Sequence, residues 1–227
     1  MIDLNLDKKI HEEKIEPNEN ISGNTPEQNL IFKFNFSVKC IKDKFSLLDY
    51  NISDELKLNI LRGQVSLLLS AVDFYIHEII KIELVNIIKR ERKETSSLKN
   101  CMISVKTFLE YITSPTINNQ IFEDEIIYRN SFKSFLEPDK MAEALSLITE
   151  KKVFKELFPK LGLLETKELK DKIKEIFKRR NSIVHQMDYD YSTKTQQTIT
   201  KEEVEDYIEF YNKFIQELHL LLLQENI

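Results

Sequence analysis

The chain has 227 residues, a formal net charge of −5 and only three glycines and five prolines. That length can bury a sizeable core as one helical domain, and the scarcity of turn-forming residues excludes the many tight turns of a sandwich or barrel. The acidic balance excludes a protein that coats nucleic acid over its whole surface, because such binding neutralises many phosphates. A local RNA site remains compatible with it. The composition therefore predicts an all-α protein.

Three observations bear on compartment and cofactors. Cys40 and Cys101 are far apart and match no metal-ligand spacing, so we expect reduced thiols in a reducing compartment. No signal peptide opens the chain, and its most apolar stretch, His219 to Leu223, is too short to cross a bilayer. The sequence also shows no H-E-x-x-H pair, glycine-rich phosphate loop or G-x-S-x-G elbow. We therefore expect a cytoplasmic protein with no metal, no cofactor and no membrane partner.

The first segment of the chain is polar and charged and lacks an apolar period. We expect residues 1–24 to form a flexible N-terminal arm and residues 25–227 to form a single helical domain. Thr25-Pro26-Glu27-Gln28 is typical of a helix start. The alternation from Phe32 to Val38 has the period of a strand. A lone strand would have no partner, so we favour a helix that continues to about Asp49.

A long helix is predicted next, at about 53–90, beginning at Ser53 and with a weak point at Gly63. Its apolar residues recur three or four positions apart, which places them on one face toward a core. These residues are Leu58, Leu61, Val65, Leu68, Val72, Ile76 and Ile79. Shorter helices are predicted at about 97–113, 117–136, 139–149 and 151–161.

The last two core helices are predicted at about 166–187 and 200–224. Thr166 is expected to cap the first, and Thr200 opens a capping box at the start of the second. Between them, the residues from Asp188 to Ile199 are polar, so we expect a mobile loop there.

An arginine occupies an unusual place in the helix predicted at 166–187. At about 100° per residue, Arg180 falls near the middle of the apolar face. Burying a guanidinium without a partner costs several kcal/mol. Arg180 must therefore form a core salt bridge, extend to solvent, or lie in a cleft or subunit interface. The apolar face consists of Leu169, Ile173, Ile176, Ile183, Val184 and Met187.

A second flank of the same helix is polar and positively charged. Asn181 and His185 are four residues apart and share this flank, with Lys174 and Lys178 on or near it. Between Lys167 and Arg180, seven basic residues outnumber three acidic ones, so the local field is positive. A histidine near a helix end or a lysine stripe is by itself usually structural or merely solvated. The combination with Arg180 favours a functional role over a structural one.

These residues carry a family resemblance. The segment from Arg180 to His185 (RNSIVH) resembles the R-x4-6-H signature of the HEPN superfamily, with its common polar residue after the arginine. Asp188 resembles the acid often found three positions after the histidine in the RiboL-PSP-HEPN subgroup. Arg62-Gly63-Gln64 and the segment 67–78 (LLLSAVDFYIHE) resemble that subgroup's first core helix. The resemblance spans about residues 53–220, whereas the segment 97–161 matches no pattern of the family.

The resemblance implies an up-and-down helical bundle with additional helices, forming a symmetric homodimer that cleaves RNA without metal. It assigns catalysis to Arg180, Asn181 and His185. Arg180 would hold the scissile phosphate, His185 and its symmetry mate would serve as base and acid, and Asn181 would orient His185 or the phosphate. Attack by the RNA 2′-hydroxyl would leave a 2′,3′-cyclic phosphate and a 5′-hydroxyl. A toxin or defence effector of this kind implies an antitoxin or regulatory protein as a further partner.

Further residues are secondary candidates. Asp73 and His77 are four residues apart and either contact the motif helix, with Asp73 as counter-ion to Arg180, or form an ordinary polar pair. Asp188 belongs either to the site or to a helix-end anchor. Basic residues of the motif helix are expected to contact RNA: Lys174, Lys178 and Arg179. His11 and His219 have no constellation around them and are interpreted as incidental.

Two other interpretations remain open. A catalytically silent HEPN-type module would bind a nucleotide, RNA or a protein partner, and oligomeric state would help to distinguish it, because a strict monomer lacks a composite cleft. In a plain helical scaffold, Arg180 would be a paired core residue whose truncation costs stability rather than activity.

Overall fold

The computed structural model describes residues 23–100, 102–114, 121, 124–125, 128–129 and 132–224. The predicted flexible arm, apart from residues 23 and 24, lies outside the described residues, as do His11 and Cys101. Most of the helix predicted at 117–136 lies outside them as well. Within the described part of the chain, no helix combines the length and the apolar character needed to span a lipid bilayer.

Helix α1 (Pro26–Asp43) begins with a capping box, in which the Thr25 hydroxyl accepts from the Gln28 N–H while the Gln28 side chain accepts from the Thr25 N–H. A 3-10 helix, η1 (Lys44–Asp49), continues it. The buried apolar residues of α1 are Leu30, Phe34, Val38 and Ile41, whereas Phe32 is 51% exposed. Burial thus follows the helical spacing, and the helix interpretation of the alternating segment is confirmed.

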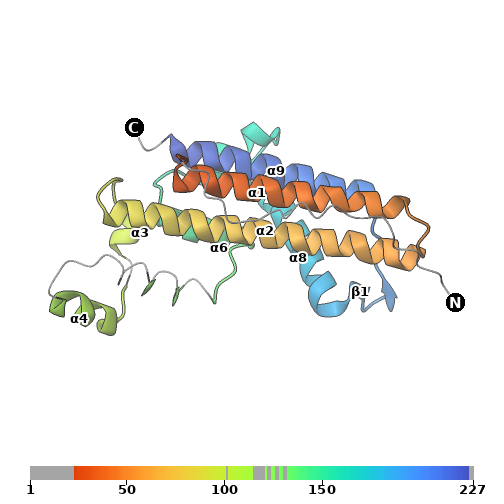
Figure 1. Ribbon diagram of the computed structural model, residues 1–227, viewed down its shortest axis with the longest axis horizontal. Helices are drawn as coiled ribbons and strands as arrows, with labels where there is room; N and C mark the ends of the chain where they lie inside the picture. Colours follow the sequence, from red (N-terminus) through yellow and green to blue (C-terminus); the bar gives the residue numbers. More distant parts are fainter. Residues whose placement is uncertain are drawn as a thin grey trace.

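Helix α2 (Asp54–Ile88) is capped by the Ser53 hydroxyl and runs through Gly63 without interruption. Helix α9 (Lys201–Leu223) starts at Thr200, whose hydroxyl accepts from the Glu203 N–H. Both helices lie close to their predicted bounds. Figure 1 shows α1, α2 and α9 side by side, with α1 antiparallel to the other two. These three long helices form the body of the bundle.

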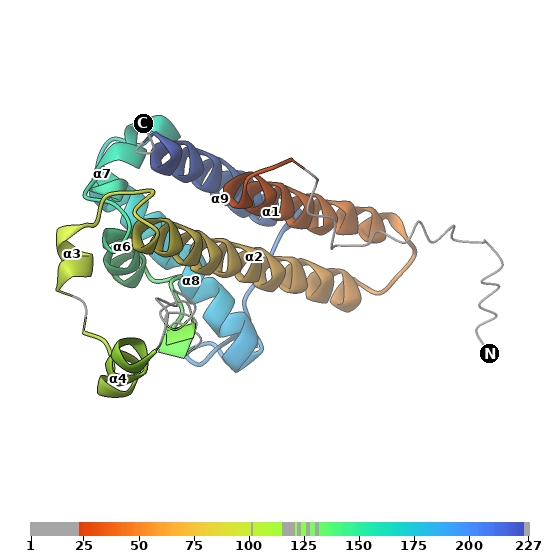
Figure 2. The ribbon, with the colours of Figure 1, turned by 60° about the vertical axis from the view of Figure 1, so that its left-hand side comes forward.

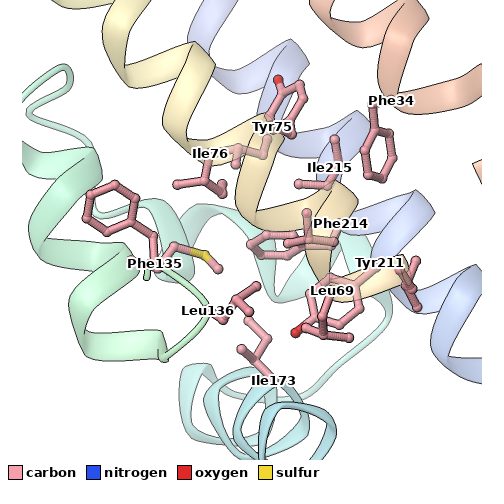
Figure 3. Close-up of a cluster of buried hydrophobic side chains, with 14 of the residues drawn as sticks. Phe34, Leu69, Tyr75, Ile76, Phe135, Leu136, Ile173, Tyr211, Phe214 and Ile215 are labelled. Atoms are coloured by element: carbon pink, nitrogen blue, oxygen red, sulfur yellow. The ribbon is translucent and has the colours of Figure 1, made fainter. Parts of the chain in front are cut away.

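The core lies between these helices and is rich in aromatic side chains. Phe34 of α1 meets the ring of Tyr75 of α2 at a centroid distance of 5.7 Å, and Tyr211 and Phe214 enter from α9. Figure 3 shows Ile173 of α8 (Thr166–Gln186) pointing toward the same cluster. The Tyr75 hydroxyl lies 3.0 Å from Nδ1 of His219, so the histidine interpreted as incidental is a buried core group.

The segment between α2 and α8 contains short helices. They are α3 (Ser96–Lys99), α4 (Val105–Thr113), α6 (Pro138–Ser146), α7 (Val153–Leu157) and a 3-10 helix η2 (Pro159–Leu161). The single helix predicted at 97–113 is wrong, because the chain leaves the helix at Asn100 and Ser104 caps a new one. The helices predicted at 139–149 and 151–161 correspond to shorter ones. The region predicted at 151–161 contains α7 and η2, and η2 is capped by Gly162, which has a φ of 78°.

Helix α8 has two unlike halves. In the first half, Leu169, Ile173 and Ile176 are fully buried against the bundle. The second half projects beyond α2, as Figures 1 and 2 show, and there Val184 is 45% and Met187 71% exposed. The predicted cap at Thr166 is wrong, since Glu165 is the N-cap residue and makes no side-chain cap bond. The apolar face is therefore only partly a core face.

The segment after α8 is a small hairpin. Strands β1 (Tyr189–Asp190) and β2 (Thr195–Gln196) pair antiparallel, with Tyr189 opposite Gln196. Asp188 and Ile199, at the two ends of the segment, are buried. The predicted mobile loop is thus corrected to a hairpin fixed at both ends. Because this two-stranded sheet is minor, the all-α prediction is confirmed, while the division into an arm and one domain stays a prediction.

Candidate functional site

Arg180 lies where α8 leaves the bundle, and it is half-buried. Its Nη1 donates to Oδ1 of Asn181 at 3.1 Å, and its buried Nε has no hydrogen-bond partner. Arg180 forms no ion pair with any residue that the structure describes. The motif arginine thus keeps its full charge in a partly desolvated position.

Other arginines of the fold are neutralised by carboxylates. Arg92 lies 2.6 Å from a buried oxygen of Glu83, and both Arg62 and Arg179 lie 2.9 Å from Asp188. Desolvation makes such pairing the usual state of a buried cation. Arg180 departs from this pattern, so the interpretation of Arg180 as a paired core residue is wrong for this structure.

His185 occupies the last turn of α8 and is exposed. It makes no hydrogen bond or ion pair with a described residue, so both ring nitrogens are accessible to a substrate. Asn181 was predicted to orient His185 or a phosphate, and in the structure its side-chain oxygen accepts from Arg180.

Asp188 acts as the anchor of this region. Its carboxylate is fully buried, and Oδ2 accepts from Nε of Arg62 and from Nη2 of Arg179, each at 2.9 Å. Its N–H donates to the Ser182 carbonyl, which closes the end of α8. Met187 and Asp188 both adopt left-handed backbone angles, with φ of 50° and 62°. Such angles cost about 1–2 kcal/mol per residue, so the carboxylate's bonds hold a strained turn in place.

Gln197, which sequence reasoning missed, completes the anchor. Its carbonyl accepts from Nη2 of Arg62 at 3.0 Å, and its Oε1 accepts from Nη1 of Arg179 at 2.7 Å. Its Nε2 donates to the Ser182 hydroxyl at 3.2 Å. No local signal marks Gln197, because its partners lie on α2 and α8. Arg62 had a signal in the R-G-Q segment, but its partner could not be read there.

The three basic residues predicted to contact RNA differ in their surroundings. The Arg179 guanidinium donates hydrogen bonds to Asp188, to Gln197 and to the Thr198 carbonyl. Lys174 and Lys178 are exposed and form no ion pair with a described residue. The structure thus gives Arg179 an internal role and leaves the two lysines free to attract an anion.

Asp73 and His77 lie close together, but they contact the backbone before α6 rather than the motif helix α8. Oδ1 of Asp73 accepts from the Phe135 N–H at 2.9 Å, and Nε2 of His77 lies 3.1 Å from the Lys133 carbonyl. The two side chains are 3.7 Å apart, and the His77 ring lies 4.4 Å from that of Phe135. The interpretation of Asp73 as counter-ion to Arg180 is therefore wrong, because its carboxylate fixes the chain before α6.

In the residues that the structure describes, no group of three or more His, Cys, Asp and Glu side chains is placed to hold a metal ion. No curated protein and no solved structure shows a significant match to the chain. The model of one protein family, described as RiboL-PSP-HEPN, matches residues 35–224. That match runs from within α1 to the end of α9 and includes Arg180, His185 and Asp188. The chain therefore belongs to the RiboL-PSP-HEPN family, and its helical body is a HEPN-type module.

Proposed function

We propose that the protein is a metal-independent endoribonuclease of the toxin or defence-effector kind. The observation that carries the proposal is the state of Arg180, a half-buried cation with no carboxylate partner among the described residues, in a fold that pairs other buried arginines. A charge kept in this state is available to an external anion. A phosphodiester fits it, because a planar guanidinium binds phosphate through two parallel hydrogen bonds.

The chemistry needs three groups around the scissile phosphate. As the RNA 2′-hydroxyl attacks phosphorus, one group accepts its proton, a second protonates the leaving 5′-oxygen, and a cation stabilises the charge that develops on the phosphoryl oxygens. Histidine near neutral pH suits both proton transfers. His185 and its copy in a second protomer take these roles, and Arg180 supplies the cation. Asn181 accepts from Arg180 and so orients the guanidinium.

A second copy of the chain supplies the other half of the site. Val184 is exposed on the same half of α8 as Arg180 and His185, and Met187 is exposed directly after that helix, so apolar surface that a partner would bury lies beside the motif. A two-fold axis near this end would bring two Arg180 and two His185 side chains together. Because free RNA cleavage harms a cell, the proposal includes a protein partner that restrains it.

The test is an RNA-cleavage assay in excess chelator with Arg180→Ala and His185→Ala. We expect each change to lower the cleavage rate by about 10²–10³-fold, the usual effect of removing a charge-stabilising or proton-transferring group. Arg90→Gly is the matched control. It removes an exposed guanidinium at a left-handed position, with φ of 61°, where glycine is unstrained.

Folding of each variant is checked by circular dichroism and urea unfolding. Full cleavage activity in either folded variant would overturn the assignment of the site. Wild-type protein that binds RNA without cleaving it would favour the silent binding module.

A further inference from the structure

A groove beside the motif helix is not used by the chemistry proposed above. It has a volume of about 710 Å³ and lies between the outer flank of α8, the hairpin and the start of α9. Ser182 and Gln186 of its wall are the residues three before and one after His185, so the groove opens next to the proposed acid–base group. The residues that line it are Glu175, Lys178, Arg179, Ser182, Gln186, Tyr189, Asp190, Tyr191, Ser192, Gln197, Glu203 and Tyr207.

Some of the side chains that line the groove are held by hydrogen bonds, whereas two tyrosines are not. Gln197 and Arg179 are held by the Asp188 anchor, and the Tyr207 hydroxyl donates to Glu203 at 2.7 Å. Tyr189 and Tyr191, in contrast, make no side-chain hydrogen bond with a described residue and are 47% and 77% exposed. The hairpin at the end of α8 (Figures 1 and 2) therefore carries two tyrosine side chains that are exposed to solvent.

The charges of the groove indicate what it can hold. Three carboxylates line it, from Glu175, Asp190 and Glu203, and of its two cations the Arg179 guanidinium already pairs with Asp188. A phosphate would be repelled by this lining, whereas a neutral aromatic ring would not be. Carboxylate and amide oxygens also accept hydrogen bonds from the amino groups of bases.

We propose that this groove binds an unpaired nucleobase of the RNA substrate, adjacent to the scissile phosphodiester, with Tyr191 as the stacking surface. The proposal rests on the ribonuclease function and adds that the substrate is single-stranded at the cleavage site. Only an unstacked base offers its ring face to an aromatic side chain and its edge to polar groups. Lys178, an exposed cation among the lining residues, can attract the RNA backbone.

The chain contains no tryptophan, so a fluorescent reporter can be placed in the groove alone. Tyr191→Trp is titrated with a short single-stranded 2′-O-methyl oligonucleotide of mixed sequence, which cannot be cleaved, and with its duplex. We expect saturable quenching by the single strand and none by the duplex. Phe32→Trp, at a 51% exposed aromatic position on α1, is the matched control and should not respond.

A kinetic measurement accompanies the titration. Tyr191→Leu should raise the KM for single-stranded RNA by about tenfold and leave kcat unchanged, because one stacked base contributes binding rather than chemistry. Tyr50→Leu, at a 66% exposed tyrosine outside the groove, should leave both constants unchanged.

Three results would overturn the nucleobase site. They are absence of quenching in Tyr191→Trp, equal quenching in Phe32→Trp, and quenching of Tyr191→Trp by inorganic phosphate alone. The proposed function fails separately: quenching by the single strand in a protein that cleaves no RNA would keep the groove as a base-binding site and remove the nuclease.

Discussion

At the scale of single residues, two neighbouring arginines have opposite roles. Arg179 is neutralised by the buried Asp188 carboxylate, whereas Arg180 has no carboxylate partner in the described structure. Helical spacing predicted that Arg180 was the unusual cation of its helix. It could not predict which of the two guanidinium groups would be paired, because Arg62, the other partner of Asp188, is 126 residues away along the chain.

Truncation of the anchor should cost stability. Asp188→Ala removes the only carboxylate that Arg62 and Arg179 contact among the described residues, and leaves two largely buried cations uncompensated. We expect a loss of about 3–5 kcal/mol in the free energy of unfolding, measured by urea denaturation. Asp206→Ala, at an exposed aspartate of α9, should change it by less than about 0.5 kcal/mol. Equal, small losses in the two variants would show that Asp188 is not an anchor.

His219 should make stability depend on pH. Burial lowers the pKa of its imidazole below the ordinary value of 6.5, although the Glu27 carboxylate opposes this. The unfolded chain therefore takes up the proton first as the pH falls. The contribution of His219 to stability is complete above pH 6.5 and is lost progressively as the pH falls below it toward the folded-state pKa.

His219→Asn tests this dependence, because the asparagine amide can take the place of Nδ1 as hydrogen-bond partner of the Tyr75 hydroxyl in either role and does not titrate. Urea unfolding at pH 7.5 and at pH 5.5 should show a smaller acid-side loss of stability in the variant than in the wild type. The same loss in both proteins would assign the acid sensitivity to other groups.

At the scale of elements, periodicity and capping residues predicted the long helices well. The bounds of α2, α8 and α9 lie within two residues of those predicted, since each buries a continuous apolar face and has recognisable ends. The hairpin could not be predicted. Its two-residue strands carry no pattern, and it is fixed by side chains of Arg62 and Arg179 on other elements.

Alanine substitution should change the stability of the protein in opposite directions at two glycines, Gly63 and Gly162. Gly63 lies inside α2 with helical backbone angles and open space where an added methyl group would lie, so Gly63→Ala should stabilise the protein by about 0.5–1 kcal/mol. Gly162 has a φ of 78° after η2, so Gly162→Ala should destabilise it by about 1 kcal/mol. Thermal unfolding of the two variants measures both effects, and a shift of the same sign in both would contradict the assigned backbone states.

At the scale of the whole molecule, we propose that the candidate site is completed by a second copy of the chain. The projecting end of α8 carries Arg180, His185 and exposed apolar side chains, and burial by a second copy explains all three together. The family resemblance led to the expectation of a homodimer. The sequence could not show that only the first half of the apolar face of α8 faces the core. The boundary between the buried and exposed halves depends on where α8 passes the edge of α2, which is a property of the tertiary structure.

In the proposed dimer, charges placed on this end of α8 should separate the two copies. The double change Val184→Glu and Met187→Glu should raise the dimer dissociation constant by about 30-fold or more, as expected when ~2 kcal/mol is lost at the centre of an interface. Folding should be unaffected, since both side chains are exposed in the single chain. Leu164→Glu, at an 88% exposed leucine before α8, is the control. Sedimentation velocity that shows unchanged association in the double variant would place the interface elsewhere.

The proposed nuclease chemistry is tested most directly by the chemical ends of the RNA fragments that form in a cleavage assay. With excess chelator, mass spectrometry of the products should show a 2′,3′-cyclic phosphate on one fragment and a 5′-hydroxyl on the other. A single 2′-deoxy substitution at the cleaved nucleotide should abolish the cut, and Arg180→Ala should form neither product above background. Cleavage that persists at the 2′-deoxy position, or that leaves 5′-phosphate ends, would contradict attack by the RNA's own hydroxyl at a site built from Arg180 and His185.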